Sequence, residues 1–352
     1  MTTEDFDRLR PIGCNAPIMQ ALSQLDGEGA PMRITEVHRD IVMVHDGSRE
    51  QRAQPLPWLA RELSTTGDAL TVGDWVLVAT DPHGSPWLTG RMPPVNRLTR
   101  RASDGGRQCL VSNVDTALLV MGLDGDHNLR RLERYLAMVQ SAGVAAVVVL
   151  TKQDLAEAAV DRIVDLHRRV PAGIPVHAVD ARSPNAAGVL HDYLDPGQTL
   201  VMLGSSGVGK STLTNTLLGH SVQATQAVRA DDSRGRHTTT ARSLHRLPCG
   251  ACVIDTPGLR GLEVDTSEQG LAASFEDIAM LAEGCRFRDC SHRDEPGCAV
   301  RAGVHPDRLT NYHKLRREIR RETMTFLDRR RQLAEWKARG RAAGQRMKMK
   351  RG

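Results

Sequence analysis

The segment Gly204-Ser205-Ser206-Gly207-Val208-Gly209-Lys210-Ser211 decides the fold at the centre of this 352-residue chain. It follows the apolar run Leu200 to Leu203, which is typical of a strand, and leads into a predicted helix from Lys210 to Leu218. A strand, a glycine-rich turn and a helix in this order form a phosphate-binding loop, because closely spaced glycines let backbone N–H groups surround phosphate oxygens. The predicted phosphate-contacting residues are Gly204, Ser205, Ser206, Gly207, Val208, Gly209, Lys210, Ser211 and Thr212.

Side chains of this loop and one downstream carboxylate have predicted roles at the phosphates. Lys210 would reach the outer phosphates, both to bind them and to assist catalysis, and the Ser211 hydroxyl would ligate Mg²⁺. Asp255 and Gly258 belong to an Asp-Thr-Pro-Gly segment that follows another apolar strand. Asp255 would hold the same Mg²⁺ through water, and the Gly258 N–H would contact the terminal phosphate. An ordinary turn is the alternative, but the position after a strand and downstream of a phosphate loop favours a nucleotide site.

A polar segment between those motifs contains His237, Thr238 and Thr239. One threonine of this segment would complete the Mg²⁺ shell in a nucleotide-dependent switch, although the sequence does not show which one. We name Thr239 as the candidate metal ligand, and both Thr238 and Thr239 as catalytic candidates. Leu259 stands where many related hydrolases have a glutamine that positions the attacking water, which predicts slow intrinsic turnover. His237 is the candidate for orienting that water, and a histidine that only packs in the loop is the alternative.

The segment Thr151-Lys152-Gln153-Asp154 comes directly after a buried strand and predicts a preference for guanine. The Asp154 carboxylate would accept hydrogen bonds from guanine N1 and N2, which adenine cannot donate. Lys152 would pack along the base. Thr151 stands where guanine-binding segments usually have asparagine, whose side-chain amide ties the segment to neighbouring backbone. Without that amide, we expect weaker binding of the base but the same preference for guanine.

A later segment, Asp180-Ala181, stands where a Ser-Ala pair usually supports the base. The order of the motifs is also unusual, because the base-reading segment precedes the phosphate loop by about fifty residues. Cutting one surface connection and joining the old termini leaves the strand contacts of a sheet intact. The motifs therefore predict a circularly permuted nucleotide-binding domain.

Short apolar runs alternate with helical stretches from Thr116 onward, which predicts a doubly wound α/β domain with strands buried on both faces. The expected strands are Thr116 to Val120, Ala145 to Leu150, Pro175 to Val179, Leu200 to Leu203 and Ala251 to Ile254. The expected helices are Leu129 to Ala142, Asp154 to Val170, Gly188 to Leu194 and Lys210 to Leu218.

The N-terminal third has a different pattern. Residues 1 to 30 mix glycine, proline and polar residues without periodicity, which predicts a loose lead-in. Five short β-type runs separated by turn residues follow, and they predict a small barrel of the OB-fold kind. The runs are Arg33 to Val37, Asp40 to Val44, Ala69 to Val72, Trp75 to Ala79 and Pro86 to Arg91.

Cysteine spacing predicts a metal site near the C-terminus. Cys285, Cys290, His292 and Cys298 lie within fourteen residues, and three thiolates with one imidazole make a closed tetrahedral set for structural Zn²⁺. Free cysteines in a small helical domain are the alternative, and His305 and His313 are reserve ligands. The odd number of cysteines fits a reducing compartment better than a disulfide framework.

Positive charge is concentrated at the C-terminus. Residues 314 to 352 contain 15 Lys and Arg against 4 Asp and Glu, whereas the rest of the chain has 32 against 38. This tail favours a polyanion such as nucleic acid, and a solvated helix with excess charge is the alternative. We find no signal peptide and no apolar run of membrane-spanning length, so a soluble intracellular protein is expected.

In combination, these motifs resemble the RsgA/YjeQ family of circularly permuted GTPases that depend on the small ribosomal subunit. The resemblance extends over nearly the whole chain and includes Asn113-Val114-Asp115 and Arg134-Tyr135-Leu136 besides the motifs above. It implies GTP and GDP with Mg²⁺ as ligands, one structural Zn²⁺, binding to the small ribosomal subunit and its rRNA, release of assembly factors in late subunit maturation, and GTP hydrolysis stimulated by the subunit. A cytoplasmic monomer is expected.

Two other functions remain open at this point. The chain could be a GTP-regulated scaffold whose hydrolysis is incidental, or an ATP-dependent, zinc-containing DNA-binding protein. Asp154 argues against the second. The predicted domains are a flexible segment at 1–30, an RNA-binding OB-fold at 31–102, the permuted GTPase domain at 103–264, a mostly helical zinc-binding domain at 265–313 and a basic helical tail at 314–352.

Overall fold

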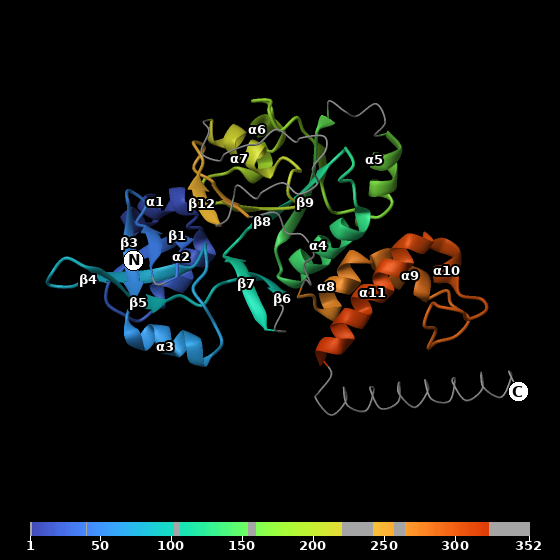
Figure 1. Ribbon diagram of the computed structural model, residues 1–352, viewed down its shortest axis with the longest axis horizontal. Coiled ribbons are helices and arrows are strands. Elements are labelled where there is room, and N and C mark those ends of the chain that lie inside the picture. Colours follow the sequence, from blue (N-terminus) through green and yellow to red (C-terminus); the bar gives the residue numbers. More distant parts are fainter. Residues whose placement is uncertain are drawn as a thin grey trace, which may run out of the picture. The chain divides into compact units, whose positions relative to one another are not determined.

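The structure of this chain is a computed structural model that describes residues 2–39, 41–101, 106–153, 160–219, 242–256 and 265–323 (Figure 1). The chain divides into two compact units, Met1–Glu276 and Asp277–Gly352. Within the described ranges, no helix is both long enough and apolar enough to cross a lipid bilayer.

A mostly parallel sheet forms the α/β part of the first unit. Its strands lie in the order β10, β9, β8, β11, β13, β12, and β12 runs antiparallel to β13. Every residue of β8, β11 and β13 is buried, which confirms the predicted doubly wound α/β architecture. The strands are β8 (Thr116–Gly122), β9 (Ala145–Thr151), β10 (Val176–Ala178), β11 (Thr199–Leu203), β12 (Ser243–Arg246) and β13 (Cys252–Asp255).

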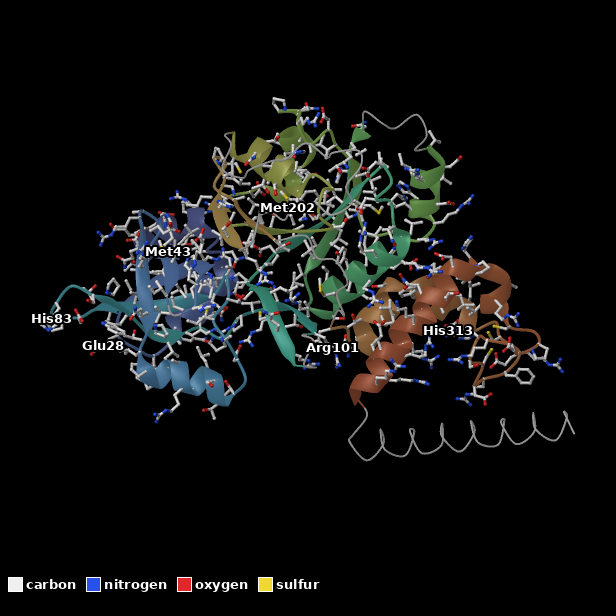
Figure 2. The ribbon with its side chains drawn as sticks, in the orientation of Figure 1. Glu28, Met43, His83, Arg101, Met202 and His313 are labelled. Atoms are coloured by element: carbon white, nitrogen blue, oxygen red, sulfur yellow. The ribbon has the colours of Figure 1, made fainter. Side chains whose placement is uncertain are left out.

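Helices cover both faces of this sheet. α6 and α7 pack on one face, where their apolar residues meet alternate side chains of the strands, including Met202 (Figure 2), and α4 packs against β8 and β9 on the other (Figure 1). The helices are α4 (Leu129–Ser141), α5 (Val160–His167), α6 (Ala186–Val189), the short 3₁₀ helix η3 (His191–Tyr193) and α7 (Lys210–Leu218). Part of the helix expected from Asp154 onward, residues 154–159, lies outside the described residues.

The strand order shows how a permuted chain builds one sheet. β8 and β9 precede β11 in the chain and lie on one side of it, whereas β13 and β12 follow it and lie on the other. Strand β11, which precedes the phosphate loop, therefore lies in the middle of the sheet and is the fourth of these six strands in the chain. Strand β12 was not predicted, because Ser243-Leu244-His245-Arg246 has no apolar run to mark it.

A closed five-stranded barrel precedes the α/β part, and it confirms the predicted barrel. The pairing runs β1, β2, β3, β5, β4 and returns to β1, so each of the five strands has two barrel neighbours. A cluster that includes Ile34, Val44, Val76 and Leu88 fills its interior. The strands are β1 (Ala30–Val37), β2 (Val42–His45), β3 (Glu50–Pro55), β4 (Trp75–Thr80) and β5 (Pro86–Arg91).

Two predictions within the barrel are wrong. The run Ala69 to Val72 is not a strand; instead Glu50–Pro55 forms β3, and only Ala53 of this strand is buried, so its sequence lacks the apolar alternation of a half-buried strand. Helix α3 (Pro57–Thr65) was also missed; it begins at a proline, and its Leu59 packs into the barrel interior.

The predicted loose lead-in at residues 1 to 30 is also wrong. Thr2 caps α1 (Thr3–Leu9), the 3₁₀ helix η1 (Arg10–Ile12) follows, and Asn15 caps α2 (Ala16–Ser23). These helices are too short to be stable alone or to show a clear period, and their stability comes from tertiary packing. Their buried residues form a cluster with two residues of the barrel region: Leu9, Ile12, Cys14, Ile18 and Leu22 with Trp75 and Met92.

Barrel and α/β sheet are joined edge to edge within the first unit. Glu36 of β1 pairs with Ser243 of β12, and Ser243 in turn pairs with Asp255 of β13. One barrel strand therefore adjoins the strand that enters from the predicted switch segment. The hairpin of β6 (Arg97–Arg101) and β7 (Arg107–Ser112) connects the two parts in the chain.

The first unit extends past the predicted end of the GTPase domain at residue 264. Helix α8 (Glu268–Ser274) packs on α4, and Ser267 N donates to Ser141 Oγ at 2.9 Å. Gly270 permits the close approach, because a Cβ there would lie 1.9 Å from Ser141 Oγ. Residues 265–276 thus pack with the α/β part, while the second unit contains α9 (Glu276–Ala282) from Asp277, α10 (Ala299–Gly303) and α11 (Pro306–Thr323).

Candidate nucleotide site and metal centre

The phosphate loop follows β11 and ends where α7 begins at Lys210. Gly207 and Gly209 have φ of 82° and 99°, left-handed backbone that favours glycine. At Gly204 the constraint is space, because an added Cβ would lie 2.4 Å from the Val120 carbonyl oxygen. Glycine is therefore required at Gly207 and Gly209 by the backbone conformation and at Gly204 by the close approach of β8.

Lys210 is buried within its own loop, with 6% of its surface exposed. Its Nζ donates to the carbonyl oxygens of Gly204 at 3.1 Å and Ser205 at 2.9 Å. Burial lowers the pKa of Lys210 to about 8, and the nearby Asp255 and Asp126 carboxylates oppose that effect. A desolvated ammonium group held at the start of a helix is suited to bind phosphate.

Ser211 and Asp255 meet as the predicted Mg²⁺ site requires. Ser211 Oγ donates to Asp255 Oδ2 at 3.2 Å. Asp255 is fully buried, and burial raises the pKa of its carboxyl group against the opposing charge of Lys210. Among the described side chains, Asp255 Oδ1 is one of the buried polar atoms without a hydrogen-bond partner. A hydroxyl and a carboxylate with one unpaired, buried oxygen fit a hydrated Mg²⁺.

The base-reading segment contacts the phosphate loop directly. Thr151, at the end of β9, is fully buried, and its Oγ1 donates to the Val208 carbonyl oxygen at 2.5 Å across 57 residues of chain. The Thr151 hydroxyl thus ties the segment to the neighbouring backbone. We had expected this role to be lost because threonine replaces the usual asparagine. Lys152 follows with a φ of 62°, and its Nζ lies 2.5 Å from Asp124 Oδ2. Gln153 is exposed, and Asp154 lies outside the described residues.

The Asp180-Ala181 segment reaches the same place from β10. Ala181 is buried, and its Cβ would lie 3.7 Å from a Cβ added at Gly209. Its carbonyl oxygen accepts a hydrogen bond of 2.6 Å from Thr216 Oγ1 on α7. Asp180 is exposed, and its Oδ1 accepts from the Arg182 N–H at 2.9 Å. Asp180 therefore stabilises its own turn, while Ala181 lies beside the phosphate loop.

Sequence reasoning missed two residues of the loop after β8, Asp124 and Asp126, and one residue of α4, Arg131. Asp126 Oδ2 accepts a hydrogen bond of 2.5 Å from Ser205 Oγ in the phosphate loop, and Arg131 Nη2 lies 2.5 Å from the same oxygen. Asp124 pairs with Lys152. The available signal was Asp124-Gly125-Asp126 at the carboxyl end of a parallel strand, where ligand-binding residues of open α/β sheets gather. The predicted switch residues His237, Thr238, Thr239 and Gly258 lie outside the described residues.

The second unit brings the four predicted metal ligands together. The ligand atoms of Cys285, Cys290, His292 and Cys298 all lie within 4.8 Å of one another. His292 Nδ1 lies 3.6 Å from the sulfurs of Cys285 and Cys298, and those sulfurs are 3.9 Å apart. Tetrahedral Zn²⁺ with bonds of about 2.3 Å sets sulfurs about 3.8 Å apart, so the cluster fits a structural zinc ion.

Neither reserve histidine belongs to this cluster. His313 Nε2 donates to the His292 carbonyl oxygen at 3.2 Å, so it supports a ligand from α11. His305 Nδ1 accepts from the Asp307 N–H at 3.2 Å at the start of the same helix. His292 itself has a φ of 60°, and its left-handed backbone turns the chain so that its ring faces the sulfurs.

Comparison with known proteins agrees with this geometry. Residues 92–265 match the family model described as RsgA GTPase. The chain is 42% identical over 333 residues to a protein from Xanthomonas axonopodis pv. citri (strain 306), with 90% of each chain covered. It is 45% identical over 307 residues to a protein from Xylella fastidiosa (strain M23), with 85% of this chain and 91% of the relative covered. Both relatives are named small ribosomal subunit biogenesis GTPase RsgA.

Two solved structures share the fold. YjeQ from Thermotoga maritima is 24% identical, with a TM-score of 0.60 over 82% of this chain and 98% of that one. YloQ, described as a circularly permuted GTPase, is 22% identical, with a TM-score of 0.56 over 85% of this chain and 98% of that one. At these identities the likeness shows the fold alone, and it matches the permuted strand order described above.

Proposed function

The chain belongs to the RsgA GTPase family and is therefore a GTP hydrolase, and we propose that it acts in late maturation of the small ribosomal subunit. In this proposal it binds the subunit and its rRNA, hydrolyses GTP slowly alone and faster on the subunit, and promotes release of assembly factors. One observation supports the nucleotide assignment above all others. Thr151 at the start of the base-reading segment donates to Val208 of the phosphate loop, so both halves of the site adjoin although their order is permuted.

The proposed nucleotide contacts follow the loop geometry. Backbone N–H groups of residues 204–212 and the Lys210 ammonium bind the phosphates. Asp154 accepts the guanine N1 and N2 hydrogen bonds, with Lys152 along the base and Ala181 below it. Asp126 acts as a positioning residue, because its bond to Ser205 Oγ and its pairing with Arg131 fix the first turn of the loop. Gln153 and Asp180 are further candidates for base contact.

Hydrolysis in this proposal uses the chain's own groups to hold and order the reactants. Ser211 and Asp255, with Thr239, hold Mg²⁺, which neutralises charge on the transferred phosphoryl group when bound. His237 orients the attacking water beside Thr238, and Gly258 contacts the terminal phosphate. The absence of a glutamine at Leu259 supports slow turnover until a partner orders these segments.

RNA contact is proposed for the barrel and the basic C-terminal segment. Small five-stranded barrels of this type bind single-stranded nucleic acid, and 15 Lys and Arg among residues 314 to 352 favour a polyanion. Cys285, Cys290, His292 and Cys298 hold one structural Zn²⁺ in this proposal. The names of the relatives support the small ribosomal subunit as partner and hence a cytoplasmic protein. We expect the chain to be a monomer.

Hydrolysis of GTP measured with and without purified small ribosomal subunits tests the proposal. We expect slow release of phosphate alone and at least tenfold faster release with subunits, and no stimulation of Ser211→Ala. Competition of GTP and ATP for the same site should favour GTP by orders of magnitude. Equal rates with and without subunits, or equal competition by ATP, would overturn the assignment.

A further inference from the structure

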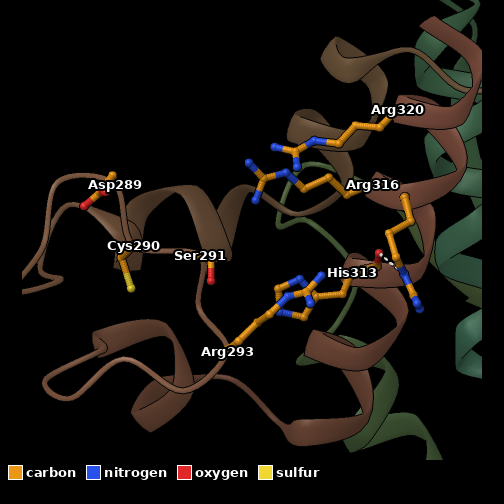
Figure 3. Close-up of a pocket in the computed structure, with 8 residues that line it drawn as sticks. Asp289, Cys290, Ser291, Arg293, His313, Arg316 and Arg320 are labelled. Atoms are coloured by element: carbon orange, nitrogen blue, oxygen red, sulfur yellow. Dashed lines mark hydrogen bonds between the residues drawn. The ribbon is translucent and has the colours of Figure 1, made fainter. Parts of the chain in front are cut away.

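A basic pocket of about 320 Å³ lies in the second unit, between the metal-binding loop and helix α11 (Figure 3). Four arginines and His313 line it, against the single carboxylate of Asp289, so its formal charge is +4 − 1 = +3 with the histidine neutral. Figure 3 shows Arg316 and Arg320 extending from α11 toward the loop that contains Ser291. The lining residues are Asp289, Cys290, Ser291, Arg293, His313, Arg316, Arg317 and Arg320.

The helical wall of the pocket is a continuous basic face. His313, Arg316, Arg317 and Arg320 are spaced i, i+3, i+4 and i+7, which places them on one side of α11. Buried Leu315 and Ile319 occupy other positions of the helix and pack into the unit. Like charges three and four residues apart on a helix repel each other and destabilise it. An anion or water molecules bound at this face would reduce that repulsion.

Most arginines of this pocket form no ion pair with a carboxylate in the described part of the chain. Among the described residues, Arg293 and Arg316 make no ion pair with a carboxylate, whereas Arg308 on the same helix pairs with Asp277 at 2.7 Å. Arg316 is half-buried, and Arg293 is exposed on the opposite wall. Their guanidinium groups keep donors available for a ligand.

The loop wall is held rigid before any ligand arrives. The Glu295 carboxylate accepts hydrogen bonds from the N–H groups of Ser291 at 3.0 Å, Arg293 at 2.9 Å and Asp294 at 3.1 Å. His313 Nε2 joins the helix to the loop through the His292 carbonyl oxygen. The pocket is therefore preorganised, which lowers the entropic cost of binding.

We propose that this pocket binds phosphodiester groups of an RNA backbone through Arg293 and Arg316. This inference rests on the proposed function, which supplies RNA as the partner. Planar guanidinium groups match the geometry of a phosphate group. Apart from His313, the lining contains no aromatic ring on which a base could stack, so the pocket would contact the phosphate backbone of the RNA and not its bases. A polyanion is favoured over a free phosphate ion because the chain continues beyond α11 with ten Lys and Arg against two acidic residues in 324 to 352.

The test uses the full chain as Arg293→Ala/Arg316→Ala and a charge-matched control, Arg288→Ala/Arg301→Ala, whose arginines are exposed in the same unit outside the pocket. Affinity for purified small subunits and for a labelled 30-nucleotide oligo(U) is measured across a salt series. We expect the pocket variant to bind oligo(U) about tenfold more weakly near 100 mM salt, with the logarithmic salt slope reduced by about 1 to 2. The control should stay within about twofold of the wild type.

Other outcomes overturn the proposal in distinguishable ways. If both double variants lose the same affinity for oligo(U), the overall charge of the unit and not this pocket determines binding. If the pocket variant loses affinity without a change in salt slope, its arginines do not contact phosphate directly. Displacement of oligo(U) from the wild type by about 1 mM inorganic phosphate, with no displacement from the pocket variant, would assign the pocket to the free ion. Zinc content and thermal unfolding show that both variants are folded. If the wild type does not bind small ribosomal subunits at all, the proposed function itself is wrong.

Discussion

Replacing Arg33 with methionine should destabilise the first unit by about 3 kcal/mol. The Arg33 side chain is fully buried where four segments of the chain meet. Its Nη1 donates to the Ile12 carbonyl oxygen and to Thr199 Oγ1, both at 2.7 Å, its Nη2 donates to the Asn113 carbonyl oxygen at 2.8 Å, and its Nε donates to the Gly73 carbonyl oxygen at 3.3 Å. Methionine has a similar length but no donor.

Opposing effects decide the size of the change. The Ile12 and Asn113 carbonyl oxygens would lose their donor inside the protein, at about 1–3 kcal/mol each, whereas the Gly73 carbonyl oxygen would keep the hydrogen bond of 3.0 Å from Asn113 Nδ2. Removal of a buried guanidinium group returns part of its desolvation cost, which is several kcal/mol. Asp115 limits that return, because burial already raises the pKa of this half-buried carboxyl group and Arg33 is the cation that opposes the shift. The lost hydrogen bonds therefore win, and we place the net loss at about 3 kcal/mol.

Urea unfolding followed by circular dichroism measures this loss. With a slope of about 3 kcal/mol per molar urea for a unit of this size, the midpoint of Arg33→Met should fall by about 1 M. Arg52→Met is the control, since Arg52 is exposed on β3 of the same barrel and should change stability by less than about 0.5 kcal/mol. A loss below about 1 kcal/mol for Arg33→Met, or one equal to that of the control, would refute the reasoning.

The remaining predictions concern the two candidate sites. Thr151→Val removes the bond to the phosphate loop with little change of shape, and GDP affinity measured by fluorescence titration should fall about fivefold, about 1 kcal/mol. Asp126→Asn keeps a hydrogen-bond acceptor but loses the charge opposite Arg131, so we expect a lower kcat/KM for GTP with unchanged zinc content. The pKa of Lys210 is lowered from 10.5 to about 8, so the unfolded chain binds more protons between those values; stability of the nucleotide-free protein should rise there with pH, while GDP affinity falls above pH 8. Cys298→Ser should reduce bound zinc, measured by elemental analysis, from one equivalent to less than half and lower the thermal midpoint of the second unit.

The nucleotide site was predictable where function requires a local backbone shape. The phosphate loop, Ser211 and Asp255 were identified because glycine spacing and flanking apolar runs are written in consecutive residues. The cluster of Cys285, Cys290, His292 and Cys298 was predictable for the same reason, since four donors within fourteen residues have few other uses. The roles of Asp154, His237 and Thr239 stay predictions, because these residues lie outside the described parts of the chain.

The contacts that hold these motifs in place were not predictable in the same way. Asp126 lies 79 residues before Ser205 in the chain, and nothing in either neighbourhood indicates that the two side chains meet. Helices α1 and α2 are not apparent from the sequence, because two helical turns are too short to show a hydrophobic period. Strand β3 was not predicted because Ala53 is its only buried residue, so its sequence lacks the apolar alternation that indicates a strand.

The sequence by itself predicted which segments would bind phosphate, base and metal, and it indicated that their order is permuted. The reason is that strand and helix periods, glycine spacing and donor type act over a few residues. Only the tertiary structure decided that β9 and β11 flank β8, so that Thr151 reaches Val208, and that Arg33 is buried between barrel and sheet. Such contacts depend on long-range packing, in which burial selects partners that are far apart in the chain.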